Sequence, residues 1–318
     1  MAIPSYHDVV IRVINLKKNF GELRAVDGLS FEIYRGEIFG FLGPNGAGKT
    51  TSINMICGLL EPSDGDIAFL NNQNNGKDKI RQHIGICPQD NIIWPKLTCL
   101  EQLVFMGEMY GMSSKSAREK SKILLASLAL ESKSKVLAGK LSGGLKRRLN
   151  ICLALIHDPD ILILDEPEAG LDPQSRIMVR NFIKNLANQK TIILTTHNMD
   201  EADRLSDRVA IIDFGKLLLL DTPENLKRSM GTGDVLEIEL DSEPQDKTEL
   251  LLSKIKDLSE DVSNVGRKLI IKAKNVINLI SQITAAINKN GFKITEMTVR
   301  ENTLEDVFIH LTGRKLRQ

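Results

Sequence analysis

The sequence predicts an α/β protein built on a sheet of buried strands, with a smaller α+β domain towards its C-terminal end. Short apolar runs such as "EIFGFLG", "DILILD" and "TIILTT" have the length and composition of strands that are covered on both faces. The first of these runs ends in glycine and leads into an amphipathic helical pattern, "TTSINMICGLL". Beyond about Pro223 the composition shifts, and short strand and helix patterns alternate.

Length and composition support two globular domains. The chain has 318 residues, which is long for one domain, and 42% of them are hydrophobic. We expect a first domain over residues 1–225 and a second over residues 226–318. Within the first, "LTCLEQLVFMGEMYGM" and "SAREKSKILLASLAL" have apolar residues at helical spacing.

The second domain has its own series of elements. "GDVLEIEL", "GRKLIIKA" and "FKITEMTV" predict strands, whereas "QDKTELLLSKIKDL", "NVINLISQITAAINKN" and "TLEDVFIHLTG" predict helices. This alternation indicates a small α+β unit with its own sheet. It contains no catalytic constellation, so we expect it to stabilise a dimer or to regulate the first domain.

Several classes of protein are disfavoured by composition. The 42 Lys and Arg residues balance 41 Asp and Glu residues, so no global charge excess points to nucleic acid or to an anionic membrane. The four cysteines show no metal-binding spacing and lie among apolar residues, which predicts buried thiols in a reducing cytoplasm.

The N-terminus lacks the pattern of a cleaved signal, and the apolar runs are shorter than the ~20 residues that span a bilayer. We therefore expect any membrane contact to be indirect, through another protein.

A phosphate-binding loop is predicted at "GPNGAGKT". This octet fits the pattern G-x-x-x-x-G-K-[ST] between a strand and a helix, which is the context that the motif requires. Main-chain N–H groups of such a loop surround the β-phosphate of a nucleoside triphosphate, and the positive end of the following helix faces it. Lys49 can then bridge the β- and γ-phosphates, and the Thr50 hydroxyl can ligate Mg²⁺. The predicted nucleotide-binding residues are Gly43, Pro44, Asn45, Gly46, Ala47, Gly48, Lys49, Thr50 and Thr51.

Two carboxylates follow a second buried strand. Asp165 and Glu166 end the run "DILILDEP", at the carboxyl edge where ligands of parallel sheets gather. Asp165 is placed to reach Mg²⁺, and Glu166 to polarise the water that attacks the γ-phosphate. Acidic residues at a strand end are often simply solvated, but this pair in a chain with a phosphate loop predicts catalysis.

His197 and Gln89 follow two further strands. His197 comes directly after "TIILTT", so its imidazole is expected at the same edge as Asp165, where it could bond the γ-phosphate and position the water. The alternative is a structural histidine, with Asp200 or Glu201 simply beginning the next helix. Gln89 follows the apolar run of "IGICPQDN", and its amide can ligate Mg²⁺ and sense a neighbouring domain. A glutamine after a strand carries little weight alone.

These motifs together resemble the nucleotide-binding subunits of ATP-binding cassette transporters. The phosphate loop, Gln89, "LSGG", "ILILDEP", "GLDP" and His197 occur in the order found in that family, over residues from about 9 to 225. The resemblance implies a mixed-sheet ATPase domain of the P-loop type, with ATP and Mg²⁺ as ligands. It also implies a helical subdomain at about 90–148, which grips a cytoplasmic helix of a membrane permease.

The "LSGG" turn has both a local and a family interpretation. Ser142, Gly143 and Gly144 precede a helical pattern with an apolar face, so Ser142 is suited to cap a helix whose free N–H groups attract an anion. In the family, two cassettes pack head to tail, and this turn covers the γ-phosphate of the ATP bound to the other cassette. The two interpretations are compatible, because a capped helix start is also a phosphate site.

Two more residues acquire roles only from the resemblance. Phe20 resembles the aromatic residue that stacks on adenine, with a core phenylalanine as the alternative. Asp172, in "GLDP", resembles the aspartate that couples the two half-sites across the dimer, although a turn Asp before proline is also favoured by local chemistry.

The sequence departs from the family at two positions. Leu145 stands where the family usually has glutamine, which removes an amide that could contact the opposing nucleotide. Glu168 stands where a small hydroxyl residue is common, and it is expected to bring another negative charge close to Glu166 and the phosphates. We expect altered affinity or rate from these changes. The alternative is a degenerate half-site that pairs with a different, complete cassette.

The ending "VRENTLEDVFIHLTGRKLR" resembles the tails of drug and lipid exporter cassettes that work with a separate permease. The resemblance therefore predicts an ATPase that pairs with a second copy of itself or a related cassette and drives an integral membrane permease from the cytoplasmic face of the cell membrane. The alternative is a soluble cassette ATPase acting on ribosomes or DNA. Such proteins usually carry two cassettes or a long coiled coil, and neither is visible here. No basic segment suited to nucleic acid is visible either, so we expect no nucleic-acid partner.

Overall fold

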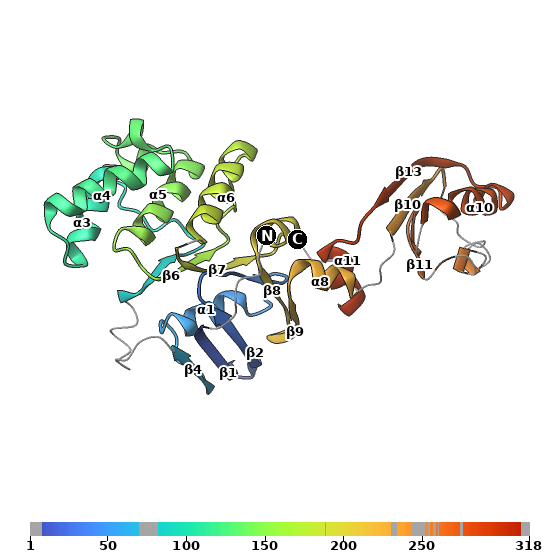
Figure 1. Ribbon diagram of the computed structural model, residues 1–318, viewed down its shortest axis with the longest axis horizontal. Helices are drawn as coiled ribbons and strands as arrows, with labels where there is room; N and C mark the ends of the chain where they lie inside the picture. Colours follow the sequence, from blue (N-terminus) through green and yellow to red (C-terminus); the bar gives the residue numbers. More distant parts are fainter. Residues whose placement is uncertain are drawn as a thin grey trace. The chain divides into compact units, whose positions relative to one another are not determined.

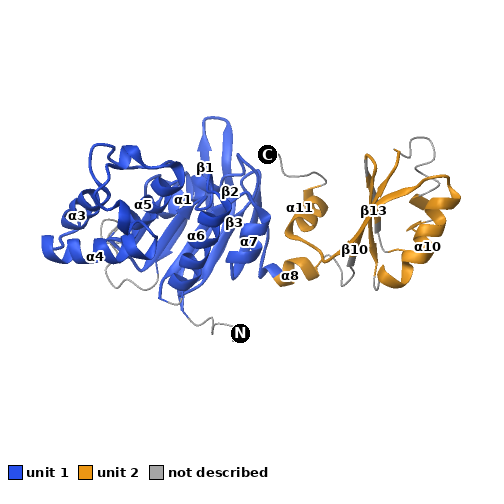
Figure 2. Cartoon of the chain, turned by 90° about the horizontal axis from the view of Figure 1, so that it is seen from above, with its two compact units in different colours: residues 1–223, 316–318 blue, residues 224–315 orange. Residues whose placement is uncertain are grey.

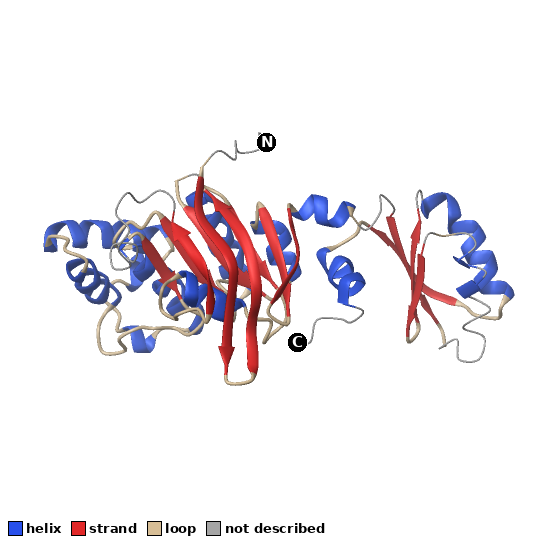
Figure 3. Ribbon diagram, turned by 90° about the horizontal axis from the view of Figure 1, so that it is seen from below, coloured by secondary structure: helices blue, strands red, loops and turns tan. Residues whose placement is uncertain are grey.

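The computed structural model divides the chain into two compact units, residues 1–223 and 224–315 (Figure 2). The residues described are 8–69, 82–187, 189–229, 234–242, 252, 253, 255, 256, 259, 261–273 and 276–312. In each unit the strands form sheets of their own, as the colours of Figure 3 show.

The first unit is built on a six-stranded sheet with strand order β5-β6-β7-β3-β8-β9. Figure 1 labels β6, β7, β8 and β9 of this sheet. Its five strands from β5 to β8 pair in parallel, and β9 pairs antiparallel with β8. All residues of β3, β6 and β7 are buried, as expected for apolar strands covered on both faces. The strand bounds are β3 Ile38–Leu42, β5 Ile84–Cys87, β6 Ile161–Asp165, β7 Thr191–Thr196, β8 Arg208–Asp213 and β9 Lys216–Asp221.

A second, antiparallel sheet in the same unit has the order β2-β1-β4, with bounds β1 Val9–Phe20, β2 Leu23–Tyr34 and β4 Asp64–Phe69. Phe31 of this sheet contacts Phe39 and Phe41 of β3, with ring centroids 5.4 Å and 5.2 Å apart. Burial of three aromatic rings in such contacts holds the two sheets together. The mixed-sheet α/β architecture is therefore as predicted.

Helices complete the first unit. The helix after the phosphate loop is α1, Lys49–Ile56, and the predicted helices at "LTCLEQ" and "SAREKS" are α3 and α4. Helices α3, α4 and α5 pack around one core that includes Leu103, Leu125 and Leu149. The remaining bounds are α3 Cys99–Met109, α4 Ser114–Ser127, η1 Glu131–Lys133, η2 Ala138–Lys140, α5 Gly143–Leu155, α6 Pro173–Ala187 and α7 Met199–Leu205.

The second unit has an antiparallel sheet of order β11-β12-β10-β13. Leu236, Ile238, Ile271, Ile283 and Ile287 belong to one core between this sheet and α10. The predicted strands and the last two predicted helices are present, β11 was not predicted, and most of the predicted helix "QDKTELLLSKIKDL" lies outside the described residues. The bounds are α8 Pro223–Arg228, β10 Asp234–Leu240, β11 Asp261–Val265, β12 Lys268–Ala273, α10 Val276–Lys289, β13 Ile294–Arg300 and α11 Leu304–Thr312.

The cysteines are structural, as predicted. Cys57, Cys87, Cys99 and Cys152 are free and buried. Burial raises the pKa of the Cys57 thiol to about 12 and that of Cys87 to about 11, so both stay protonated and unreactive at neutral pH. Within the described residues, every helix falls short of the length and apolar character that crossing a bilayer requires.

Arg300 connects β13 to the start of α11 and to the neighbouring strand. Its guanidinium donates to both carboxylate oxygens of Asp306, at 2.6 and 3.0 Å, and to Glu237 at 2.8 Å. Burial opposes ionisation of Asp306, but hydrogen bonds from Arg300 and Thr303 outweigh it and lower the pKa of this carboxyl. The ion pair therefore stabilises the second unit at pH values where an ordinary aspartate is charged.

We expect Arg300→Met to lower the free energy of unfolding of the second unit by about 2 kcal/mol, because it leaves the buried Asp306 carboxylate without its cation. A lowered carboxyl pKa gives stability that is lost as the pH falls through the folded-state pKa, so the difference between wild type and variant should shrink as the pH falls below ~3.9, the pKa of an ordinary aspartate. Urea denaturation with hydrogen exchange in β10 and β13 measures this. Arg267→Met, which removes an exposed pair with Glu239, is the control, expected to change stability by under ~1 kcal/mol. An equal loss in the two variants would contradict the assignment.

Candidate active site

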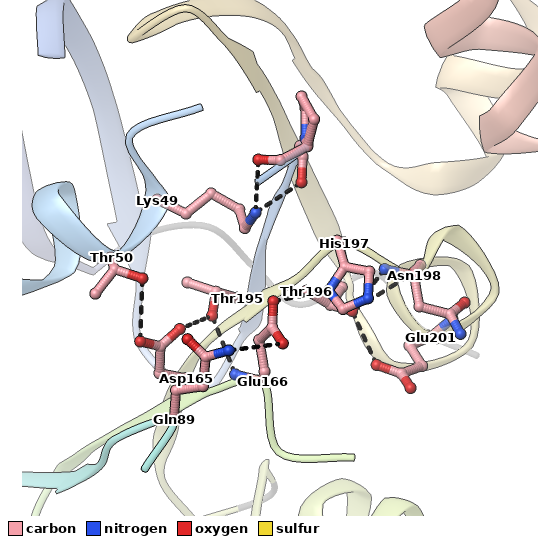
Figure 4. Close-up of polar contacts among 12 residues, drawn as sticks. Lys49, Thr50, Gln89, Asp165, Glu166, Thr195, Thr196, His197, Asn198 and Glu201 are labelled. Carbon is pink, nitrogen blue, oxygen red and sulfur yellow. Dashed lines mark hydrogen bonds and ion pairs between the residues drawn. The ribbon is translucent and has the colours of Figure 1, made fainter. Parts of the chain in front are cut away.

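The polar residues singled out in the sequence meet at one edge of the six-stranded sheet (Figure 4). Strands β3, β5, β6 and β7 run parallel, so their carboxyl ends lie together. Lys49 and Thr50 begin α1, directly after the loop that follows β3. The loop after β5 carries Gln89, Asp165 ends β6, and His197 follows β7.

The phosphate loop requires two of its glycines, Gly43 and Gly48, for space. A Cβ on Gly43 would lie 2.2 Å from the carbonyl oxygen of Ile212, and one on Gly48 would lie 2.5 Å from that of Ala25. Gly48 also has φ 98°, a left-handed conformation that favours glycine, and it precedes α1 without a side-chain cap. The first N–H groups of α1 therefore remain free to bind an anion, and the first turn carries no acidic residue to compete.

Lys49 is a buried cation held by the loop itself. Its ammonium donates to the carbonyl oxygens of Gly43 at 2.7 Å and Pro44 at 3.0 Å, and the residue is only 6% exposed. Burial lowers the pKa of Lys49, and the nearby Glu166 and Asp165 carboxylates counteract that effect. A buried ammonium bonded to carbonyls rather than to a carboxylate is suited to bind the negative charge of phosphates.

Asp165 is bonded to two hydroxyl groups from different elements. Thr50 Oγ1 donates to one carboxylate oxygen at 3.2 Å, and Thr195 Oγ1 donates to the other. The predicted metal-ligating pair, Thr50 and Asp165, is therefore in direct contact. Thr195 was not singled out in the sequence, although a polar residue inside an otherwise apolar strand was an available signal.

Glu166 contacts both of the other predicted catalytic residues. Its carboxylate lies 2.7 Å from His197 Nδ1 and accepts a hydrogen bond from Gln89 Nε2 at 3.4 Å. The Glu166 side chain is 9% exposed and that of His197 is 47% exposed, so the pair is reachable from solvent on the histidine side. A carboxylate held by an imidazole and an amide is suited to accept a proton from water.

The backbone at Glu166 is strained. Its φ of 51° lies in the left-handed region, which costs a non-glycine residue of order 1–3 kcal/mol. The amide of Glu166 donates to the carbonyl oxygen and to Oγ1 of Thr195, each at 3.1 Å. Such strain persists only where the surroundings fix the conformation. Here the surroundings fix the position of the Glu166 side chain at the centre of the site.

The Ser142 turn lies outside the polar contacts of Figure 4. Ser142 Oγ caps α5 by accepting from the Leu145 amide at 3.4 Å, as its local sequence predicts. A Cβ on Gly143 would have no neighbour within 4 Å, and one on Gly144 would lie 3.8 Å from Asp172 Oδ2. Because of the latter distance, this aspartate and the Ser142 turn lie side by side. Asp172 also accepts a hydrogen bond from the Ser175 amide at 3.0 Å. The local roles of Ser142 and Asp172 are therefore present.

Phe20 is not part of the core. It lies at the end of β1 and is 49% exposed, with the Lys18 ammonium 5.3 Å from the centre of its ring. Exposure of this extent excludes the alternative of a core phenylalanine. An exposed ring that already accepts a cation is free to stack on a flat ligand.

The expectation for Glu168 needs correction, because its charge does not add to the site. Glu168 is fully buried and forms a bidentate pair with Arg180 of α6, at 3.1 and 2.9 Å, while Arg176 lies 3.7 Å away. The sequence-based expectation missed these partners because Arg176 and Arg180 lie eight and twelve residues further along the chain, on α6. Glu168 also hydrogen bonds with Glu201, and burial together with the Glu168 charge raises the pKa of Glu201 to about 7.

The site just described defines a P-loop nucleotide-binding protein. An ABC transporter family model matches residues 26–169, and a model of the C-terminal domain of DrrA1-3-like ATP-binding proteins matches residues 222–312. The chain is 36% identical to the linearmycin resistance ATP-binding protein LnrL of Bacillus subtilis, over 97% of this chain and 100% of that protein. It is also 36% identical to the Nod factor export ATP-binding protein I of Ralstonia nicotianae, over 97% and 95%.

A solved structure agrees with the sequence relatives. The dimeric post-hydrolysis state of an ATP-binding cassette with ADP and Pi superposes with a TM-score of 0.61, at 26% identity, over 67% of this chain and 98% of that one. The chain therefore belongs to the ATP-binding proteins of ATP-binding cassette transporters, which are ATPases coupled to transport. The alternative of an ATPase acting on ribosomes or DNA is not favoured.

The carboxyl pair of Glu168 and Glu201 predicts a pH-dependent stability. Since the pKa of Glu201 is raised above that of an unfolded glutamate, the stabilisation is complete below pH ~4.5 and is lost as the pH rises through about 7. We expect this group to lower the free energy of unfolding by about 1–3 kcal/mol between pH ~5 and ~8. Chemical denaturation at both pH values should show this loss in wild type and a smaller loss in Glu201→Gln. The same pH dependence in both proteins would contradict the assignment.

Proposed function

We propose that this chain binds ATP with Mg²⁺ and hydrolyses it to drive an export permease. The observation that carries the proposal is the cluster of Lys49, Asp165, Glu166 and His197 at the sheet edge. Lys49 is bonded to the phosphate loop, Asp165 to Thr50, and Glu166 to His197. Relatives of this chain are named for linearmycin resistance and Nod factor export, which favours export as the direction of transport.

The residues divide the chemistry between binding and proton transfer. Lys49 and the free N–H groups at the start of α1 bind the β- and γ-phosphates, and Phe20 stacks on the adenine. Glu166 accepts a proton from the attacking water, because its carboxylate is fixed 2.7 Å from the imidazole of His197. His197 holds that carboxylate and contacts the γ-phosphate from its exposed side.

A magnesium ion would be held by Thr50, Asp165 and Gln89. The donor set fits a hard cation, since it consists of a hydroxyl, a carboxylate and an amide oxygen. Thr50 and Asp165 are already in contact, so they are oriented towards one position. When bound, Mg²⁺ neutralises charge that develops on the phosphates during cleavage.

Two cassettes are proposed to enclose each ATP. The start of α5 offers Ser142, Gly143 and Gly144 as an anion site, and no neighbouring atom lies within 4 Å of a Cβ on Gly143. This open turn would cover the γ-phosphate bound to the phosphate loop of a second copy or a related cassette. Asp172 lies beside the turn and would couple the two half-sites, while the departure at the partly buried Leu145 would tune affinity.

A permease segment is proposed to occupy an apolar groove of about 280 Å³ in the first unit. The groove is lined by residues that follow α1 and β5 and by residues of α3 and α5, including the exposed Leu59, Ile92 and Trp94. Pro88, next to Gln89, also lines it, so an occupant would press on the loop that carries a proposed metal ligand. An apolar groove of this kind suits a short amphipathic helix of a membrane protein.

The domain assignment follows from these roles. Residues 1–225 would form the ATPase domain, with a helical subdomain at about 90–148, and residues 226–318 would form an accessory domain that stabilises the dimer or regulates it. Such a protein would work as a peripheral subunit on the cytoplasmic face of the cell membrane.

Glu166→Gln tests the proposed base. The variant should keep nucleotide binding but lose hydrolysis by about 10²-fold or more, since an amide cannot accept the proton. An ATP-bound dimer should then accumulate, which light scattering in saturating ATP and Mg²⁺ measures. A variant that stays monomeric under these conditions would contradict the enclosed-ATP dimer for two identical copies.

Lys49→Ala tests the proposed role of the buried ammonium as the counter-charge of the phosphates. Loss of the buried ammonium should abolish nucleotide binding or hydrolysis, because the phosphates lose their main counter-charge. Binding of a fluorescent ATP analogue measures this directly, and a variant that binds and hydrolyses ATP as wild type does would contradict the role of Lys49.

Ile92→Asp tests the groove. A charge at this exposed position should prevent an apolar segment from docking, so a polytopic membrane protein that copurifies with the wild-type chain from gently solubilised membranes should be lost. Ile123→Asp is the matched control, because Ile123 is equally exposed on α4 but does not line the groove. Equal copurification with both variants would exclude the groove as the docking site.

A further inference from the structure

Arg147 of α5 is a buried cation. The residue is only 2% exposed. Within the described residues, all hydrogen-bond acceptors of its guanidinium are main-chain carbonyl oxygens. Nη1 donates to the carbonyl oxygen of Pro88 and, at 3.2 Å, to that of Gln89. Nη2 donates to the carbonyl oxygen of Asp165 and, at 3.0 Å, to that of Glu166, and Nε reaches that of Pro167 at 3.4 Å.

These acceptors belong to the two loops that carry the proposed metal ligands and base. Pro88 and Gln89 follow β5, whereas Asp165, Glu166 and Pro167 end β6 and follow it. One planar guanidinium therefore spans both loops and fixes the distance between their backbones. Asn150, one turn further along α5, adds a hydrogen bond from its amide to the carbonyl oxygen of Asp90 at 3.3 Å.

The segment that Arg147 holds is also the strained one. Glu166 has φ 51°, and strain of this kind needs surroundings that fix the conformation. The Thr195 contacts hold the amide side of Glu166, and Arg147 holds the carbonyl oxygens on both sides of the strained residue. Without the guanidinium, the Glu166 backbone could relax and carry its carboxylate away from His197.

The geometry points to Arg147 as the positioning residue of the hydrolytic site. We infer that its guanidinium sets the spacing of the Gln89 loop and the Asp165–Glu166 loop, and thereby aligns the metal ligands with the base. It lies near the start of α5, whose N-cap is Ser142, so a movement of the Ser142 turn would be transmitted to both loops. This inference rests on the roles proposed above for Gln89, Asp165 and Glu166.

Lysine is a sharp test of this inference. An ammonium at position 147 keeps the charge but offers its donors at one point, so it cannot bridge carbonyls of two loops as a guanidinium does. If the charge alone mattered, Arg147→Lys would rescue activity and Arg147→Gln would not. If the spacing matters, both variants fail in the same way.

The experiment compares Arg147→Lys and Arg147→Gln in the full chain. We expect kcat to fall about 10- to 100-fold in both, with more Mg²⁺ needed for half-maximal rate, because the metal ligands lose their alignment. Binding of a fluorescent ATP analogue in EDTA should stay within about twofold of wild type, since Lys49 and the phosphate loop are untouched. Arg148→Lys is the control, because Arg148 bonds Leu128 and Met178 instead of the site loops, and its kcat should stay near wild type.

Two other outcomes overturn the inference. An unchanged kcat in Arg147→Lys would show that charge alone is needed. If the variants lose kcat, nucleotide binding in EDTA and thermal stability together, Arg147 serves the fold as a whole. A wild-type chain that binds ATP without hydrolysing it would instead contradict the proposed function, and it would leave no rate for Arg147 to control.

Discussion

The site depends on the parallel pairing of β3, β5, β6 and β7. Their main-chain hydrogen bonds bring four carboxyl ends to one edge, although the residues there come from positions as distant as Lys49 and His197. Parallel strands need covered faces, and the aromatic contacts of Phe31 with β3 and the helical core around α5 provide that cover. Packing of apolar residues thus fixes the polar chemistry at the edge.

Buried charge is the cost of building the site, and each buried charge has a specific partner. Lys49 and Arg147 are satisfied by main-chain carbonyls, whereas Glu168 is satisfied by Arg180 and shares a hydrogen bond with Glu201. Removing Arg180 would leave the Glu168 carboxylate uncompensated in a low dielectric. The loops around the site are therefore held by electrostatic contacts, as well as by the sheet.

The sequence was sufficient wherever a residue follows a buried strand directly. Asp165, Glu166 and His197 could be placed because strand and motif are adjacent in the chain, and the same holds for Lys49 after β3. Partners through space were not accessible in this way. Arg147 acts on main-chain carbonyls, which have no sequence signature, and the charge of Glu168 was misjudged because Arg180 lies twelve residues away in sequence. The short, polar β11 gave no apolar alternation to detect.

Helix α5 connects the functional surfaces of the first unit. Ser142 caps its start, Arg147 and Asn150 hold the loops of the proposed hydrolytic site, and Leu153 and Ala154 line the apolar groove near its end. At 1.5 Å per residue, these groups span about 18 Å along one helix. A helix with a buried apolar face moves as a body, because its core contacts allow few intermediate positions. Contact with nucleotide at one end and with a permease segment at the other would therefore act on the same helix, and Arg147 would report that movement to Glu166.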